Sequence, residues 1–199
     1  MSIKINGATT NVDAEVDSVS RALRVTIYDV NGVAFGPRYT YDAATAAFTP
    51  GATPQDVFTI QGSNTKLIRV TRIRLTSVQN TAGINSWFLV RRSSANTGGT
   101  STVITVVPRD STQTAGTATA RSYTANPTAG TLVGSIRSTK LLSPAPASVA
   151  NDSLIWDFDD IQTNPVVLVN ANETIAINFN GAALPAGLSL HCSVTWTEE

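Results

Sequence analysis

Residues 187–196, which read GLSLHCSVTW, alternate between apolar and polar side chains without interruption. A β-strand has a side-chain period of two, so every second residue lies on the same face of its sheet. The two sets here are Leu188, Leu190, Cys192, Val194 and Trp196 against Ser189, His191, Ser193, Thr195 and Thr197. This pattern predicts an antiparallel strand with one face on a hydrophobic core and the other face polar.

Similar short segments, rich in β-branched and aromatic residues, recur along most of the chain and are separated by stretches rich in Gly, Pro, Ser and Asn. Their ranges are 24–30, 56–62, 66–75, 86–92, 101–107, 131–142, 154–158, 166–169 and 173–180. About ten short strands of this kind predict an all-β fold, an antiparallel β-sandwich of the jelly-roll-like type. Residues 173–180 and 187–196 are expected to pair as a hairpin through the loop GAALPAG.

The first part of the chain has fewer strand signals than the rest. We expect residues 1–55 to form an extended N-terminal arm with one or two strands, and residues 56–199 to form the sandwich domain. Within the arm, the apolar residues of segment 12–23 have helical spacing, which allows a short helix as well as an extended chain. The N-terminus shows no apolar segment of the secretory type, which favours synthesis and retention in a cytoplasm.

Charge is unevenly distributed although 14 Lys and Arg balance 14 Asp and Glu. Residues 57–151 hold ten bases and one acid, whereas residues 152–199 hold seven acids and no Lys or Arg. In one interpretation, basic and acidic strands are neighbours in one sheet and neutralise each other. In a second, they form opposite surfaces that attract other copies or a charged scaffold. The third, nucleic-acid binding, is opposed by the acidic end of the chain.

The stretch KLIRVTRIRL at residues 66–75 places four cations among aliphatic residues. Its apolar alternation changes phase between Val70 and Ile73, which predicts a β-bulge or a strand that passes between two sheets. In a regular strand, Arg69 would lie on the face opposite to Arg72 and Arg74. Because residues 57–109 contain no Asp or Glu, these cations are expected to find carboxylate partners in the acidic C-terminal strands, in the same chain or in a neighbour.

Catalytic and metal-binding patterns are weak in this sequence. A single cysteine and a single histidine argue against a disulfide framework and a zinc site. Asp157 and Asp159 could share a cation or act as paired acids, but we prefer an edge strand with a charged outer face. Trp87, Trp156 and Trp196 could bind a sugar, but their apolar neighbours favour core packing. We therefore expect no enzymatic activity, no cofactor and no metal site.

Two stretches, together with the closing VLVNANETIAINFNG…LHCSVTWTEE, carry a family resemblance. The first runs from RALRVTIYDVNG at residue 21 to TSVQNTAG at residue 83, and the second from LVRRSSANTGG at residue 89 to SIRSTKL at residue 141. In texture and order of segments they resemble virion structural proteins of tailed bacteriophages. The resemblance implies a capsid decoration or cement protein that bridges and stabilises capsid subunits. The alternative that it leaves open is a head or tail fibre or adaptor module that binds a host receptor or glycan.

The resemblance also implies where such a protein acts and what it contacts. Its location would be the virion, after synthesis in the host cytoplasm, and its partner would be the major capsid protein or another virion protein. It would form a homotrimer and bind neither nucleic acid nor membrane. Charged residues are 14% of the chain, against roughly 25% in an average domain, which suits a protein packed against others. The expected interface residues are Arg69, Arg72, Arg74, Arg91, Arg92, Asp157, Asp159 and Asp160.

Overall fold

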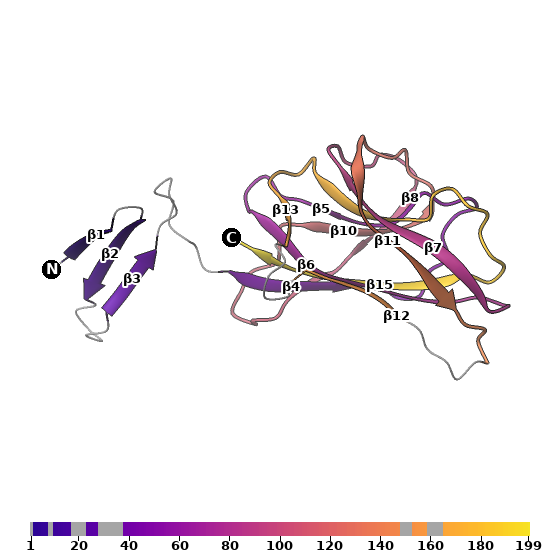
Figure 1. Cartoon of the computed structure of the whole chain (residues 1–199), viewed down its shortest axis with the longest axis horizontal. Coiled ribbons are helices and arrows are strands. Elements are labelled where there is room, and N and C mark those ends of the chain that lie inside the picture. The colour runs from indigo at the N-terminus through magenta and orange to yellow at the C-terminus, as the bar shows by residue number, and fades with distance from the viewer. Residues whose placement is uncertain (1, 8–9, 17–22, 28–37, 148–152, 159–164) are drawn as a thin grey trace. The chain divides into compact units, whose positions relative to one another are not determined.

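The computed structural model describes residues 2–7, 10–16, 23–27, 38–147, 153–158 and 165–199. Within these ranges all regular secondary structure is β-strand, which confirms the predicted all-β class (Figure 1). The chain divides into two compact units, one of residues 1–38 with residue 199 and one of residues 39–198. The described residues include no helix with the length and apolar character required to cross a membrane.

The smaller unit contains three strands, which form an antiparallel sheet in the order β1-β2-β3. These strands are β1 (Ser2–Gly7), β2 (Thr10–Val16) and β3 (Leu23–Ile27). Of the segment whose spacing allowed a helix, residues 12–16 lie in β2 and residues 17–22 lie outside the described residues.

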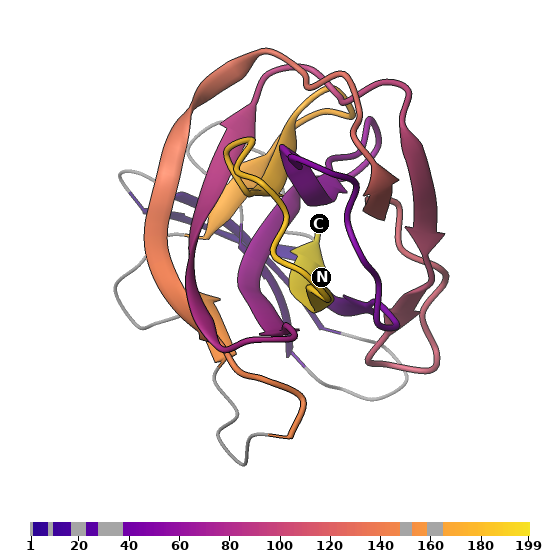
Figure 2. The same ribbon diagram turned by 90° about the vertical axis from the view of Figure 1, so that its right-hand side faces the viewer.

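The larger unit is a sandwich of two antiparallel sheets (Figures 1 and 2). Sheet I has the order β11-β7-β14-β5-β10-β8. Its strands are β5 (Asp56–Gln61), β7 (Gly83–Arg92), β8 (Thr100–Ile104), β10 (Thr119–Ala125), β11 (Leu132–Ser143) and β14 (Thr174–Asn178).

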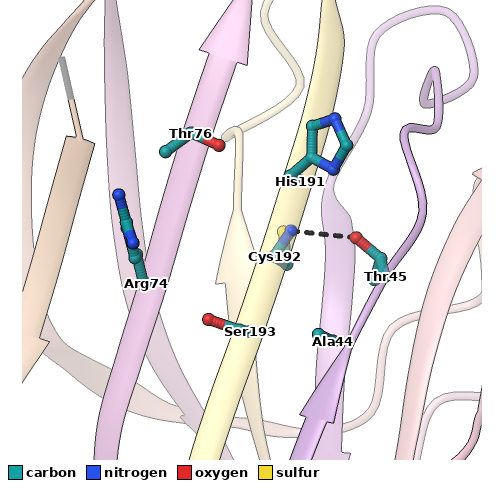
Figure 3. Close-up of a pocket in the computed structure, with 7 residues that line it drawn as sticks. All are labelled: Ala44, Thr45, Arg74, Thr76, His191, Cys192 and Ser193. Atoms are coloured by element: carbon teal, nitrogen blue, oxygen red, sulfur yellow. Dashed lines mark hydrogen bonds between the residues drawn. The ribbon is translucent and has the colours of Figure 1, made fainter. Parts of the chain in front are cut away.

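Sheet II has the order β12-β6-β15-β4-β9, and a further strand, β13, also pairs with β6. Its strands are β4 (Tyr39–Ala44), β6 (Ile68–Val78), β9 (Val106–Pro108), β12 (Ser153–Asp157), β13 (Val166–Leu168) and β15 (Ser189–Glu198). The strand with the clearest alternation in the sequence, β15, lies between β6 and β4 at the centre of this sheet (Figure 3).

Eight strands have the connectivity of a jelly roll. In chain order they are β4, β5, β6, β7, β11, β12, β14 and β15. The first pairs with the eighth, the second with the seventh, the third with the sixth and the fourth with the fifth. Pairing of β6 with β15 and of β7 with β14 joins these four pairs into two sheets. This nested arrangement is the double Greek key of a jelly roll, and it confirms the predicted sandwich.

The connection between β7 and β11 adds strands to both sheets. β10 and β8 extend sheet I beyond β5, and β9 extends sheet II beyond β4. The single strand predicted for residues 101–107 is therefore two strands, β8 and β9, in different sheets. β10 was not predicted, because its two ends fall within turn-rich stretches, residues 109–120 and 124–130.

Two expectations about connections differ from the structure. β14 and β15 do not form a hairpin, because β14 lies in sheet I and β15 in sheet II, and the loop between them crosses the sandwich. β4 pairs with β15 from Ser193 to Glu198, so the larger unit begins at Tyr39 rather than at residue 56. Both differences have one cause, since nested jelly-roll pairing joins strands that are far apart in the sequence.

The phase change in the basic stretch produces a β-bulge in β6. Thr195 lies opposite Arg72 and Trp196 lies opposite Val70, which leaves Thr71 as the extra residue. At the same residue the neighbour on the other edge of β6 changes from β12 to β13. The Thr71 hydroxyl donates a hydrogen bond to the carbonyl of Thr195 at 3.1 Å. The predicted bulge is confirmed, and β6 remains within one sheet.

The bulge changes which residues share a face. The apolar residues of β6 on both sides of Thr71 lie in the core, and each is at most 1% exposed: Ile68, Val70, Ile73 and Leu75. Arg69, Arg72 and Arg74 therefore all belong to the outer face of sheet II. The expectation that Arg69 lies opposite to the other two arginines is wrong, because the bulge takes up Thr71 and keeps the residues on both sides of it in phase.

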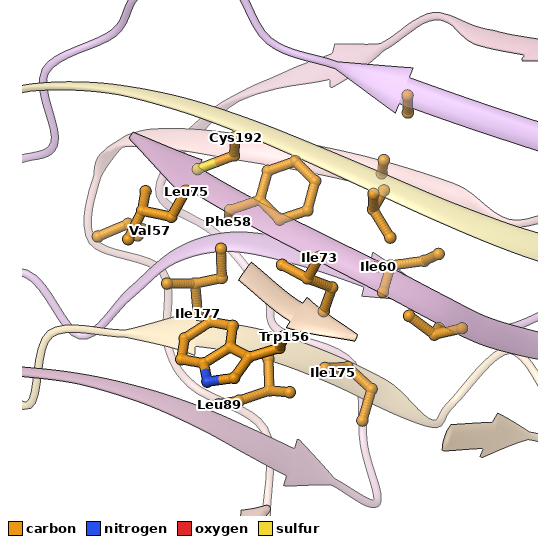
Figure 4. Close-up of a cluster of buried hydrophobic side chains, with 14 of the residues drawn as sticks. Val57, Phe58, Ile60, Ile73, Leu75, Leu89, Trp156, Ile175, Ile177 and Cys192 are labelled. Carbon is orange, nitrogen blue, oxygen red and sulfur yellow. The ribbon is translucent and has the colours of Figure 1, made fainter. Parts of the chain in front are cut away.

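The hydrophobic core lies between the two sheets. Ile73 and Leu75 of sheet II belong to the same buried cluster as Ile175 and Ile177 of sheet I (Figure 4). The three tryptophans, at positions 87, 156 and 196, are 0%, 6% and 0% exposed, so the prediction that they pack in the core is confirmed. None of them offers an exposed ring for a sugar to stack on.

Candidate interaction surface

The strand pairing assembles a polar surface on the outer face of sheet II, called the charged face below. Alternation along its four longest strands brings charged and hydroxyl residues into adjacent rows. The residues are Asp42, Arg69, Arg72, Arg74, Thr76, Asp157, His191, Ser193, Thr195 and Thr197. The face thus combines four of the eight expected interface residues, Arg69, Arg72, Arg74 and Asp157.

Arg72 and Asp157 form an ion pair across two neighbouring strands. They are direct register partners between β6 and β12. The Arg72 Nε and Nη2 atoms donate to Asp157 Oδ2 at 2.9 and 2.6 Å. The interpretation that basic and acidic strands neutralise each other within one sheet is confirmed for this pair. β12 is also an edge strand, as predicted, and Asp157 is the one charged residue on its outer face within the described residues.

A second ion pair on the charged face joins Asp42 and Arg109. Arg109 Nε and Nη2 donate to the Asp42 carboxylate at 2.6 and 3.1 Å, and the Thr195 hydroxyl donates to it at 2.6 Å. Partial burial acts to raise the pKa of Asp42, but the hydrogen bonds from Arg109 and Thr195 and the charge of Arg109 outweigh burial and lower the pKa. Asp42 is therefore ionised at neutral pH.

We expect Arg109→Met to raise the pKa of Asp42. A carboxyl with a folded pKa below its unfolded value stabilises the fold above the unfolded pKa and loses that stabilisation as pH falls through the folded pKa. The wild-type protein should therefore lose this contribution below about pH 4, and the variant should lose less of it. Both side chains are more than a third exposed, so the effect on unfolding stays within about 1 kcal/mol. A carboxyl NMR titration tests this, with Arg121→Met as control; an unchanged Asp42 pKa would contradict it.

Arg74 differs from these cations because, among the described residues, it has no ion-pair or hydrogen-bond partner. It lines a shallow hollow of about 320 Å³ on the charged face (Figure 3). The other residues of the hollow include the imidazole of His191 and the hydroxyls of Thr45, Thr76 and Ser193. One cation surrounded by hydrogen-bonding groups can receive a carboxylate from another molecule.

Cys192 contributes its backbone to this hollow, and its N–H donates to the Thr45 hydroxyl at 2.9 Å. Its thiol belongs to the core face, and complete burial raises the pKa of the thiol well above its usual range. A buried thiol that stays protonated does not act as a nucleophile. The described residues also contain no group of three or more His, Cys, Asp or Glu that could hold a metal ion.

The remaining expected interface residues lie elsewhere or outside the described residues. Arg91 pairs with Glu173 at 2.9 Å, with both residues in sheet I or beside it. Arg92 is 5% exposed and forms a bidentate ion pair with Asp56, with Nε–Oδ2 at 2.6 Å and Nη2–Oδ1 at 2.7 Å. Arg92 is thus a structural residue and is not accessible to a partner. Asp159 and Asp160 lie outside the described residues.

Two buried carboxylates were not recognised in the sequence. Asp56, which is 1% exposed, also accepts hydrogen bonds from Asn96 and Asn178, both at 2.7 Å. Glu198, which is 2% exposed, accepts from the backbone of Thr117 and from the indole of Trp196 at 2.8 and 2.9 Å. The alternation of the last strand predicts the burial of Glu198 if it is continued past Trp196, because both residues have the same parity. No comparable signal marks Asp56.

Comparison of the chain with protein-family models, with curated proteins and with solved structures finds no match.

Proposed function

We propose that this chain is a structural protein of a tailed-bacteriophage virion, acting as a capsid decoration protein that bridges and stabilises capsid subunits. The observation that carries the proposal is the jelly-roll connectivity of the eight nested strands. Jelly rolls recur in viral capsid proteins. The sequence resemblance to phage virion proteins supports the same assignment independently of the strand pairing.

The charged face supports a role in binding another protein. Two ion pairs hold their own side chains in fixed positions across β12, β6 and β4. Arg74 remains available beside them, in an open hollow of the same face. Complementary charges at a protein interface direct encounter and fix the relative position of the partners. The partner of this face is therefore an acidic surface on the major capsid protein or another virion protein.

The alternative, a fibre or adaptor module that binds a glycan, has less support. It relied on aromatic side chains that stack on sugar rings, but all three tryptophans belong to the core. The long loop between β9 and β10 remains available for receptor contacts in that alternative. Binding to purified host polysaccharide, with no binding to capsids, would favour it over decoration.

Charge reversal at Arg74 should weaken capsid binding by about tenfold or more, the equivalent of 1.4 kcal/mol. The measurement is co-sedimentation of purified protein with capsids of the encoding phage that lack this chain. Arg121→Glu in sheet I is the matched control, since it makes the same charge change away from the charged face. Failure of the wild-type protein to bind any virion particle would overturn the proposed function. Equal binding by Arg74→Glu and wild type would overturn the assignment of this face alone.

A further inference from the structure

Two adjacent rows of the charged face differ in their acids, where a row is a set of residues opposite one another on β12, β6, β15 and β4. Arg72 and Arg74 are two residues apart on β6, so they belong to neighbouring rows of the same face. The registers give the row of Arg72 the residues Asp157, Thr195 and Asp42, and the row of Arg74 the residues Ile155, Ser193 and Ala44. The first row thus contains two carboxylates, whereas the second has aliphatic side chains at the same positions.

The hollow at the row of Arg74 is lined by hydrogen-bond donors. Its polar side chains are those of Thr45, Arg74, Thr76, His191 and Ser193. None of the described residues that line it is an acid, and within the described chain only the Thr45 side chain has a hydrogen-bond partner. Figure 3 shows the hydroxyls of Thr76 and Ser193 directed into the space between β6 and β15. A guanidinium only donates, and hydroxyl and imidazole groups can donate beside it, so the hollow fits an anion.

The neighbouring arginines and Ile155 indicate which kind of anion fits. Arg72 and Arg109 each donate from Nε and Nη2 to the carboxylate of an aspartate, at distances of 2.6–3.1 Å. Arg74 has Ile155 as its register partner on β12, and this side chain is 51% exposed. A carboxylate on an aliphatic stem can bind Arg74 and cover Ile155 at the same time, whereas inorganic phosphate has no apolar part to place there.

We propose that the row of Arg74 binds one acidic side chain, an Asp or Glu, of the virion partner. Its carboxylate accepts hydrogen bonds from Arg74 and from the hydroxyls of Thr76 and Ser193, and its methylene groups pack on Ile155. The aspartates of the adjacent row are already paired with their own arginines, so one positive charge meets one negative charge across the interface. The identity of the partner rests on the proposed function, whereas the chemistry of the site does not.

NMR titration of the full chain with small carboxylates tests the site at constant ionic strength. Isovalerate, a carboxylate with a branched aliphatic tail, should shift the signals of Thr76, His191 and Ser193. Arg74→Gln should weaken this binding about tenfold or more, whereas Arg121→Gln, the same change in sheet I, should leave it unchanged. Methanesulfonate, which has the same charge and no aliphatic tail, should bind more weakly than isovalerate. Equal binding by Arg74→Gln and wild type, or by the two anions, would overturn the proposal.

The contribution of Ile155 is measured separately from that of Arg74. Isovalerate should bind about threefold or more tightly than acetate, because its tail buries apolar surface on Ile155. Ile155→Ala should remove most of this preference and leave acetate binding unchanged. Val103→Ala is the matched control, since Val103 is an aliphatic residue of sheet I that is 56% exposed. An unchanged preference in Ile155→Ala would overturn the apolar part of the site.

Competition links the site to the virion partner. Isovalerate at ten times its dissociation constant should weaken co-sedimentation with capsids severalfold, up to the effect of Arg74→Glu. Methanesulfonate at the same concentration controls for ionic strength and should have less effect. Capsid binding that is equal in the two anions would overturn the assignment of this row to the partner contact. The titrations use the isolated protein, so a failure to bind capsids and a failure to bind carboxylates are distinguishable.

Discussion

Asp56→Ala is expected to lower the free energy of unfolding by about 3–5 kcal/mol, because it removes one partner of a buried ion pair. The Asp56 carboxylate accepts hydrogen bonds from Nε and Nη2 of Arg92, and from the side-chain amides of Asn96 and Asn178. After the substitution, Arg92 keeps one hydrogen bond, from Nη1 to the carbonyl of Gly130 at 2.8 Å, but its charge remains buried without an anion. Desolvation of an unpaired charge is the dominant cost.

Urea unfolding followed by tryptophan fluorescence measures this loss, since all three tryptophans belong to the sandwich. Asp42→Ala is the control, because Asp42 also pairs with an arginine but its side chain is 38% exposed. That variant should lose about 1 kcal/mol or less. Asp56→Ala combined with Arg92→Met should recover part of the stability, since it removes the unpaired charge together with its partner. A loss near 1 kcal/mol for Asp56→Ala alone would show that the pair contributes no more than a surface contact.

The alternation in the sequence predicted the individual strands better than it predicted their neighbours. The segment 187–196 forms most of β15, and the phase change in the basic stretch marks the bulge at Thr71. Both features depend on the period of two within one strand, which a local pattern contains. Sheet membership depends on residues far away in the chain. The crossing between β14 and β15, and the position of β4 beside β15, therefore had no local signal.

Charge segregation predicted the partners of the arginines in part. Arg72 and Arg91 do pair with carboxylates of the acidic C-terminal segment, Asp157 and Glu173. Arg92 and Arg109 instead pair with Asp56 and Asp42, which precede the basic segment. In a jelly roll, the first strands of the domain lie beside the last, so early carboxylates reach the same surfaces as late ones. A net charge summed over a sequence segment does not contain that information.

The bulge links the fold to the candidate surface. If β6 continued through Thr71 as a regular strand, without the bulge, the aliphatic residues before and after Thr71 would lie on opposite faces of β6, and so would Arg69 and Arg72. With it, one strand supplies the core of sheet II and three cations of the charged face. The bulge therefore determines both the core contacts of β6 and the position of its arginines on the proposed binding surface.

Trp196→Ala is expected to lower the free energy of unfolding by about 3–5 kcal/mol, as for other large core side chains. The indole is completely buried and stacks on Tyr41, with ring centroids 6.0 Å apart. Its Nε1 also donates to Glu198, which accepts hydrogen bonds from the backbone of Thr117 and Ala118. Removal of the ring leaves a cavity and takes one donor from a buried carboxylate. Urea unfolding measures the loss, and a change below about 1 kcal/mol would contradict this role.

A second indole in the same core separates the two contributions of Trp196. Trp87 is equally buried, but its Nε1 has no hydrogen-bond partner in the described part of the chain, and its ring packs on Phe179 at a centroid distance of 4.7 Å. Trp196→Phe should therefore lower the free energy of unfolding by about 1.5–3 kcal/mol more than Trp87→Phe does, which is the contribution of a hydrogen bond to a charged group. Both variants lose a similar volume, so their difference reports the polar contacts of the two indoles: a hydrogen bond to Glu198 is lost at position 196, and a buried unpaired N–H is removed at position 87. Equal losses would mean that Glu198 is satisfied by its backbone donors alone and that Trp196 stabilises the sandwich through packing.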